Sequence, residues 1–203
     1  LDSLVTQVLE WSKTSPQDTY HVNDMKTPSG RVHVGALRGV ILHDLLAKAL
    51  ASLAPEKVIS TYVFNDMDPM DALPSYLDYS QYSADMGKPL FMIPPPPLDQ
   101  CGIDLSQTSE SELEDLKNAK NFAELYAVDF IQAFRSLGCT QKIIWSHELY
   151  ESGKMDKMIR LALDSVTPLK KIYQDVAKYK LPELWYPFQV ICPECGKVGT
   201  TLV

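Results

Sequence analysis

Hydrophobic positions along the chain switch between helical and strand-like spacing, in an order that predicts an α/β fold. Helical spacing is present over residues 2–13, over 35–53 up to Pro55, and over 122–137 up to Gly138. β-branched and aromatic residues predict strands over 19–25, 58–64 and 142–145. The order strand, helix, strand, insertion, helix, strand is that of a βαβαβ half of a doubly wound, Rossmann-like parallel sheet.

The rest of the chain predicts an insertion and a separate C-terminal element. Residues 66–118 contain four consecutive prolines at 94–97 and an acidic run over 109–115, which indicate an exposed, mobile insertion. Within it, Ser109 and Glu112 have the spacing of a capping box. Helices are expected over 154–166 and 169–177, separated by Pro168. We therefore expect a catalytic half-domain over 1–180, with the insertion at about 66–118, and a metal-binding β element that begins at 181–203.

Composition narrows the protein class. The 203 residues are 45% apolar and 22% charged, which is ordinary globular usage and excludes global disorder. No apolar run reaches the roughly 18 residues of a membrane span, and residues 1–11 lack the basic start of a secretory signal. Four cysteines are too few for a disulfide scaffold, so we expect a reduced, cytoplasmic protein without membrane contact. The net charge of −7 excludes a basic surface over the whole chain.

A turn that contains Gly30 and Gly35 connects the first predicted strand to the second predicted helix. A helix N-terminus presents unpaired N–H groups that suit a phosphate, and Gly30 and Gly35 would let a nucleotide approach the backbone closely. His33 stands just before the helix, where its imidazole could donate to a phosphate oxygen. The spacing fits neither a Walker loop nor a Gly-x-Gly-x-x-Gly fingerprint. The alternative is an ordinary turn with a surface histidine.

Two cysteines near the end of the chain have metal-ligand spacing. Cys192 and Cys195 flank Pro-Glu and precede Gly196, the pattern of a zinc knuckle. A closed zinc site needs four ligands, and we expect the other two beyond Val203. A redox pair is the alternative, although no thioredoxin-like context surrounds the motif. Because the chain begins with Leu1 and stops eight residues after Cys195, we expect it to be a fragment.

The residues from Pro28 to Ala36 resemble the first signature of class I aminoacyl-tRNA synthetases, His-Ile-Gly-His, with Ala36 in the last position. Further stretches resemble the class I lysyl-tRNA synthetases in order and spacing; these are residues 64–68, 86–89, 146–150, and 181–187 leading into Cys192. The resemblance covers about residues 19–200. Only the acidic stretch around 106–117 looks like an addition to the family pattern.

The resemblance implies a fold, a reaction and a set of partners. The fold is the Rossmann-like sheet of HIGH-type nucleotidyl transferases, and the reaction is ATP-dependent activation of L-lysine followed by its transfer to tRNA(Lys), with Mg²⁺ and a structural Zn²⁺. His33 would be the catalytic donor to the transition state. The ATP site would comprise Thr27, Pro28, Ser29, Gly30, His33, Gly35 and Ala36.

The resemblance also assigns residues to the lysine substrate. Asp66 and Asp68 follow the second strand at its carboxyl end, where open α/β sheets bind ligands, and a desolvated ammonium group needs a carboxylate. With Thr27, these two acids are the candidate lysine site. They could also hold Mg²⁺. The alternative is a turn, since Asp-x-Asp-Pro is common loop chemistry.

Residues 154–158, Lys-Met-Asp-Lys-Met, imitate the second class I signature, Lys-Met-Ser-Lys-Ser. We reject this match because Met155, Met158 and Ile159 share one face of a predicted helix, whereas that signature belongs on a mobile loop. The family's own loop and its anticodon-binding part would lie beyond Val203, so this chain alone is expected to be inactive.

Two other functions compete with this interpretation. A class I synthetase of glutamyl type would share the signature, but Asp66 and Asp68 would then face an acidic substrate. A zinc-knuckle RNA-binding module on a Rossmann-like core would need a basic patch, which the charge of −7 disfavours.

Overall fold

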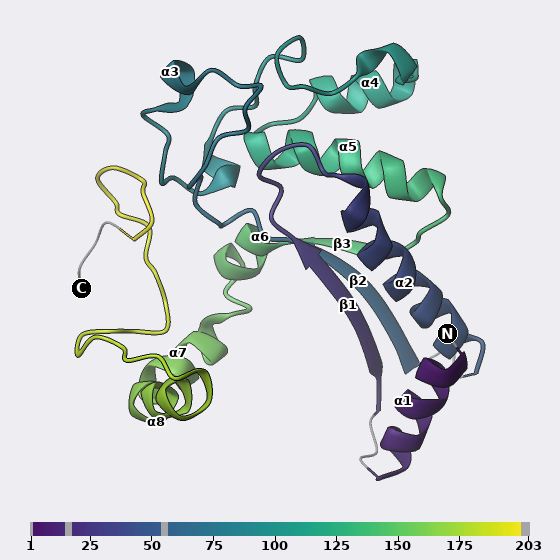
Figure 1. The fold of residues 1–203 in the computed structure, drawn as a ribbon, viewed down its shortest axis with the longest axis vertical. Coiled ribbons are helices and arrows are strands. Elements are labelled where there is room, and N and C mark those ends of the chain that lie inside the picture. The colour runs from purple at the N-terminus through teal and green to yellow at the C-terminus, as the bar shows by residue number, and fades with distance from the viewer. Residues whose placement is uncertain (1, 15–17, 54–56, 200–203) are drawn as a thin grey trace.

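A parallel sheet lies at the centre of the computed structural model, which describes residues 2–14, 18–53 and 57–199 (Figure 1). Its strands are β1 (Tyr20–Lys26), β2 (Val58–Phe64) and β3 (Lys142–Trp145), in the order β1-β2-β3. Lys26 is opposite Phe64, and Phe64 is opposite Trp145, so the three carboxyl ends are aligned. The predicted βαβαβ arrangement is confirmed.

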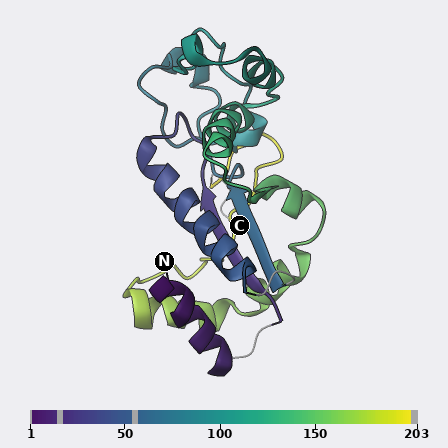
Figure 2. The same ribbon diagram turned by 90° about the vertical axis from the view of Figure 1, so that its right-hand side faces the viewer.

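Two helices cover one face of this sheet (Figures 1 and 2). α2 (Val34–Ala51) connects β1 to β2, and α5 (Phe122–Ser136) precedes β3. Right-handed crossovers in a sheet of this strand order put both helices on the same side. The core between them and the sheet is largely aromatic, and its buried members include Val40, Tyr62, Phe64, Phe130 and Phe134. The predicted end of α2 at Pro55 lies outside the described residues.

The N-terminal helix α1 (Asp2–Thr14) packs beside the second half of α2. A small cluster joins the two helices to the sheet through Val5, Val22, Ala47 and Leu50. The opposite face of the sheet has a different character. His21, Asn23 and Met25 of β1 alternate with the inward residues of that strand and are exposed, and Ile59 of β2 is 47% exposed.

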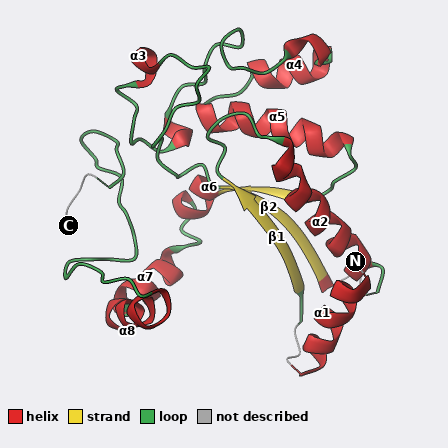
Figure 3. Ribbon diagram, viewed as in Figure 1, coloured by secondary structure: helices red, strands yellow, loops and turns green. Residues whose placement is uncertain are grey.

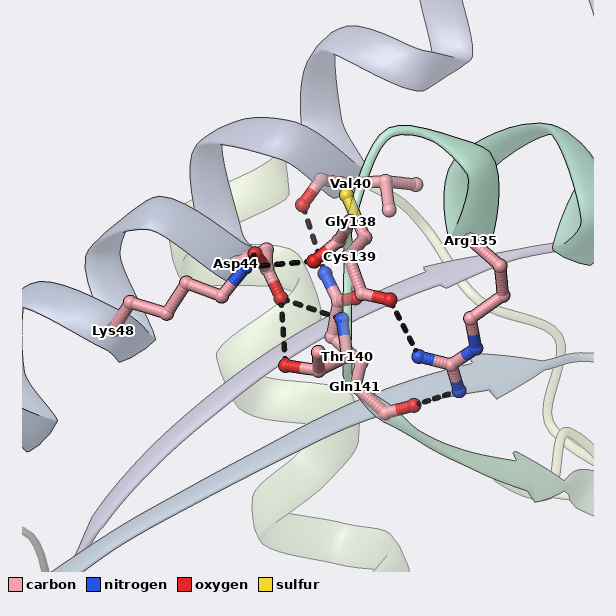
Figure 4. Close-up of polar contacts among 8 residues, drawn as sticks. All are labelled: Val40, Asp44, Lys48, Arg135, Gly138, Cys139, Thr140 and Gln141. Atoms are coloured by element: carbon pink, nitrogen blue, oxygen red, sulfur yellow. Dashed lines mark hydrogen bonds and ion pairs between the residues drawn. The ribbon is translucent and has the colours of Figure 1, made fainter.

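A polar network ties α2 to the start of β3 (Figure 4). The buried carboxylate of Asp44 accepts hydrogen bonds from the backbone N–H and the hydroxyl of Thr140, at 2.8 and 3.2 Å, and pairs with Lys48 at 2.6 Å. The buried side chain of Gln141 donates to the carbonyl of Val40 at 2.8 Å. These contacts join residues about one hundred positions apart, so they fix where β3 enters the sheet.

The turn between α5 and β3 is held by one arginine. Gly138 ends the helix with φ of 80°, a left-handed conformation that glycine adopts without strain. Arg135 then donates to the carbonyl oxygens of Cys139 and Gln141, at 2.7 and 2.6 Å. The predicted helix stop at Gly138 is therefore confirmed.

The insertion differs from the expectation of an exposed, mobile segment. It contains α3 (Tyr79–Tyr82), two 3₁₀ turns, η2 (Leu90–Met92) and η3 (Leu105–Gln107), and α4 (Glu110–Lys117). Its apolar residues form a second core with the first half of α5, and buried members of this core include Met70, Leu77, Tyr82, Leu90, Ile93, Leu116, Phe122 and Tyr126. The expectation of an exposed segment was wrong, because widely spaced apolar residues form a core within it, while the acids of the run over 109–115 stay outside this core. The capping box of Ser109 and Glu112 is present.

After β3 the chain leaves the sheet through three helices and a loop (Figure 3). These are α6 (Ser146–Glu151), α7 (Asp156–Asp164), α8 (Val166–Ile172) and a π-helical turn, η4 (Tyr173–Ala177). The predicted break at Pro168 is wrong, because this proline occupies the first turn of α8, where no backbone donor is needed. No described helix is long and apolar enough to cross a membrane.

Candidate functional site

The signature turn lies at the carboxyl edge of the sheet, between β1 and α2. His33 is the N-cap residue of α2, with extended backbone angles (φ −75°, ψ 154°), and its side chain is exposed. The His33 side chain makes no capping hydrogen bond to the helix. Apart from the N–H of Ala36, which donates to the His33 carbonyl, the backbone donors at the start of α2 lie beside an accessible imidazole, an arrangement that suits an anionic group.

Gly35 leaves room for that imidazole. A Cβ atom at position 35 would lie 2.8 Å from His33 Nδ1 and 2.9 Å from Cε1, which is closer than real Cβ atoms come. The ring thus rests over the first turn of α2, and the backbone N–H of Ala36 donates to the His33 carbonyl at 3.0 Å. The position of the His33 ring therefore requires glycine at position 35.

Residues expected in the lysine and nucleotide sites meet across β1 and β2. The Thr27 hydroxyl donates to the carboxylate of Asp68, which is 41 residues away in sequence. Nearby, the backbone N–H of Asn65 donates to the Lys26 carbonyl at 2.9 Å. Pro28 is buried and Ser29 is exposed, so the turn is anchored at one residue and open at the next. Asp68 is half-buried and keeps its carboxylate at the edge of the sheet.

Asp66 has a different environment from Asp68. It is 1% exposed and accepts hydrogen bonds from the backbone N–H of His147, at 3.0 Å, and from its Nδ1. The His147 ring stacks on Phe91, with centroids 4.8 Å apart and planes 7° from parallel. Asp66 therefore joins the end of β2 to the start of α6 and to the insertion. In the sequence the two acids are equivalent candidates, and no local signal there identifies His147 as the partner of Asp66.

A cavity of about 700 Å³ opens beside Asp68. One wall is the chain after β2, including Asn65 and Asp68, and another is Tyr150 of α6. The C-terminal loop supplies further aromatic lining, Trp185, Tyr186 and Phe188. A carboxylate among aromatic faces suits an organic cation with an apolar stem. Residues 181–187 were singled out in the sequence only for their resemblance; Trp185 and Tyr186 within them were the signal for this wall.

The cysteine knuckle has the backbone of a tight turn. The N–H of Gly196, at φ of 71°, donates to the Cys192 carbonyl at 2.8 Å, and the Cys192 N–H donates to the Lys197 carbonyl at 2.9 Å. Ile191 and Val198 form a β-bridge across it. Within the described residues no group of three or more His, Cys, Asp or Glu side chains is placed to hold a metal ion. The expected metal site at Cys192 and Cys195 is therefore not shown by the described residues. Residues 200–203 of the predicted element lie outside the described part.

Comparison with known proteins shows which family the chain resembles. Three archaeal relatives named lysine–tRNA ligase are similar to the chain. The protein from Methanosarcina acetivorans is 30% identical over 177 residues, covering 87% of this chain and 29% of the relative. Those from Methanosarcina barkeri and Methanocaldococcus jannaschii are 28% and 26% identical, over 98% and 100% of this chain and 34% of each relative.

The chain thus spans about a third of the length of these curated relatives. A family profile described as tRNA synthetases class I (K) matches residues 1–203. The resemblance identified from the sequence is confirmed, and the chain belongs to the class I tRNA synthetases of the lysine type.

Proposed function

We propose that the chain is part of a lysine–tRNA ligase, which activates lysine with ATP and transfers it to tRNA. The observation that carries this proposal is the exposed His33 over Gly35, at the same sheet edge as the half-buried Asp68. Family membership and the names of the relatives support it. Aminoacylated tRNA is used in translation, so we propose that the protein acts in the cytoplasm.

In the first step, a lysine carboxylate oxygen attacks the α-phosphorus of ATP. A new P–O bond forms, the bond to the β-phosphate oxygen breaks, and pyrophosphate leaves with the electron pair. The His33 imidazole would donate to an α-phosphate oxygen, and the first N–H groups of α2 would face the phosphates. Thr27 to Gly30 would line the phosphate and amino-acid edge. The chain mainly positions reactants and balances developing charge.

Mg²⁺ would neutralise phosphate charge when bound. The described residues offer no cluster of three acidic ligands for it. Magnesium often binds through one or two carboxylates plus substrate phosphates, so the triphosphate itself would supply most of its ligands.

Asp68 is the better of the two acids for a lysine ammonium group. Asp68 lines the 700 Å³ cavity, whereas the carboxylate of Asp66 is occupied by His147. The aromatic lining would cover the aliphatic stem of lysine, and Thr27 orients the Asp68 carboxylate through its hydrogen bond. A glutamate substrate would bring a second carboxylate to this acid, which opposes the glutamyl alternative.

In the second step, a hydroxyl of the terminal tRNA ribose attacks the carbonyl carbon of the lysyl-adenylate, and AMP leaves. The charge distribution supports RNA as the partner. Residues 154–180 carry seven Lys and Arg against three Asp, a net charge of +4, while the remaining residues carry 12 basic and 23 acidic side chains, a net charge of −11. The basic residues are almost all exposed, and Lys170, Lys178 and Lys180 line a hollow of about 550 Å³.

Charge reversal tests this RNA contact. In the complete protein, Lys178→Glu with Lys180→Glu should weaken tRNA binding at least tenfold and flatten its dependence on salt concentration, because about two phosphate contacts are lost. The matched control is the same reversal at two exposed lysines, Lys117 at the end of α4 and Lys120 just before α5. Equal binding by both double variants would contradict the proposed contact.

A structural zinc ion would be held in part by Cys192 and Cys195. Two thiolates in a tight turn are half of the usual ligand set, and the proposal requires two more ligands from elsewhere in the complete protein. Metal analysis of that protein should give one zinc per chain, lost in a Cys192→Ser, Cys195→Ser variant. An unchanged zinc content in the variant would reject this assignment.

The sharpest test of the whole function is His33→Ala in the complete protein. We expect the rate of adenylate formation to fall about 10²–10³-fold, as for other lost transition-state donors, with little change in lysine affinity. His43→Ala, nine residues into α2 from the first helical residue, is the matched control. An equal loss of rate and of lysine affinity would contradict the role of His33.

A further inference from the structure

A tyrosine of the insertion touches the signature turn from outside. The Tyr76 hydroxyl accepts a hydrogen bond from the backbone N–H of Arg31, at 2.8 Å. Position 30 fits closely against the same segment, since a Cβ there would lie 2.8 Å from Pro74 Cγ and 3.0 Å from the Tyr76 oxygen. Gly30 also has φ of 153°, a conformation that other residues rarely adopt. The peptide between Gly30 and Arg31 is thus held in one orientation.

The tyrosine is itself held from its other side. A Cβ at Gly102, whose φ is 73°, would lie 2.9 to 3.0 Å from three carbon atoms of the Tyr76 ring. The carbonyl of Gly102 accepts a hydrogen bond from Arg31 Nη1, at 2.7 Å. Arg31 is therefore held twice, through its backbone by Tyr76 and through its side chain by Gly102. We call Tyr76, Gly102 and Arg31 the tyrosine brace.

The brace is anchored in the core of the insertion. The buried Tyr126 of α5 donates to the carbonyl of Cys101, at 3.1 Å, which fixes the residue just before Gly102. Burial, and secondarily the neighbouring Tyr76, raises the pKa of Tyr126, so its phenol stays a neutral donor. The Tyr76 and Tyr126 rings lie 6.5 Å apart. A continuous set of contacts thus runs from the buried core to the turn two residues before His33.

We infer that Tyr76 is a positioning residue for the nucleotide site: by holding the Gly30–Arg31 peptide, it sets where His33 and the first N–H groups of α2 stand. This inference rests on the proposed function for its kinetic readout. Tyr76 is 40% exposed and the Arg31 N–H is at the surface, so water can replace the lost partner. Its loss therefore affects the geometry of the turn more than the stability of the fold.

Tyr76→Phe in the complete protein tests the inference, because it keeps the ring against Gly102 and removes only the hydroxyl that contacts Gly30 and Arg31. Misplacing a reacting group by about 1 Å can lower a rate about 10²-fold. We expect kcat/KM for ATP to fall about tenfold, KM for lysine to change less than twofold, and the melting temperature to stay the same. The Arg31 amide proton should exchange with solvent about tenfold faster. Tyr79→Phe, at a 62% exposed tyrosine of the same insertion, is the matched control.

A double-mutant cycle separates positioning from general damage. Arg31→Ala removes the other arm of the brace, so its effect and that of Tyr76→Phe should be less than additive, whereas Tyr79→Phe should add nothing. Wild-type ATP kinetics in Tyr76→Phe would overturn the inference, as would an equal loss for all substrates with a lower melting temperature. Should the unaltered protein fail to charge tRNA, the proposed function fails, and calorimetric binding of a non-hydrolysable ATP analogue still decides the role of Tyr76.

Discussion

Replacing Asp44 with Ala tests how strongly the polar network holds β3 against α2. The buried carboxylate accepts two hydrogen bonds from Thr140 and pairs with Lys48, which is half-exposed. A hydrogen bond to a charged group contributes about 1.5–3 kcal/mol, and an ion pair with an exposed partner adds about 0.5 kcal/mol. The variant is relieved of burying a charge, which offsets part of this loss. We expect unfolding free energy to fall by about 2–4 kcal/mol.

Urea denaturation measures this change. With a slope of about 2 kcal/mol per molar urea, the midpoint should fall by about 1–2 M. Lys48→Ala should have a much smaller effect, because its partner keeps both Thr140 bonds. Asp71→Ala, at an exposed acid, serves as the control. A loss below about 1 kcal/mol, or an equal loss for Lys48→Ala, would refute the central role of the Asp44 carboxylate.

The same network predicts a dependence on pH. Burial alone would raise the pKa of Asp44, but hydrogen bonds from Lys48 and Thr140, with the Lys48 charge, lower it below its usual value. A lowered pKa in the folded state means that the carboxylate stabilises the fold above the unfolded value of about 3.9. That contribution is lost as the pH falls through the lower, folded value. The difference between the unaltered protein and Asp44→Ala should therefore narrow below about pH 4.

Two further changes should separate stability from chemistry in the complete protein. Gly35→Ala should raise helix stability by up to about 1 kcal/mol but slow adenylate formation, because the new Cβ displaces the His33 ring. Unfolding measurements test the gain in stability, and ATP–pyrophosphate exchange tests the loss of rate. An unchanged rate would count against the position assigned to the His33 ring. Asp68→Asn should raise KM for lysine more than Asp66→Asn does. Asp66→Asn should lower the melting temperature more, because it weakens the contact with His147. A larger rise in KM for Asp66→Asn would return the substrate role to Asp66.

Elements with strong local signals were predictable from the sequence. β2 was predicted at the residues where it lies, since Val58 to Phe64 is a short β-branched and aromatic run bounded by breakers. α5 was predicted to within a residue of its bounds because its apolar spacing is regular and Gly138 stops it. The break predicted at Pro168 was wrong, since proline is as common in the first turn of a helix as in the loop that precedes one.

Contacts between distant segments were not predictable. Asp66 and Asp68 are two residues apart and chemically identical, yet one is enclosed by His147 and the other lines the cavity. Only the folded chain brings His147, 81 positions away, to Asp66. The insertion was misjudged for a related reason. Its core residues, such as Met70 and Ile93, are spaced irregularly among prolines, so no periodicity marks them as buried.

The bare side of the sheet has a practical consequence for anyone who handles this polypeptide alone. Parallel sheets are normally sandwiched between helices on both sides, yet here Met25 and Ile59 meet solvent next to His21 and Asn23. In the described residues β1 is also an edge strand, so backbone N–H and C=O groups along its outer side can pair with a strand of another molecule. Expressed by itself, the polypeptide should therefore self-associate, and a solubility-enhancing fusion would leave the exposed sheet face and strand edge unchanged.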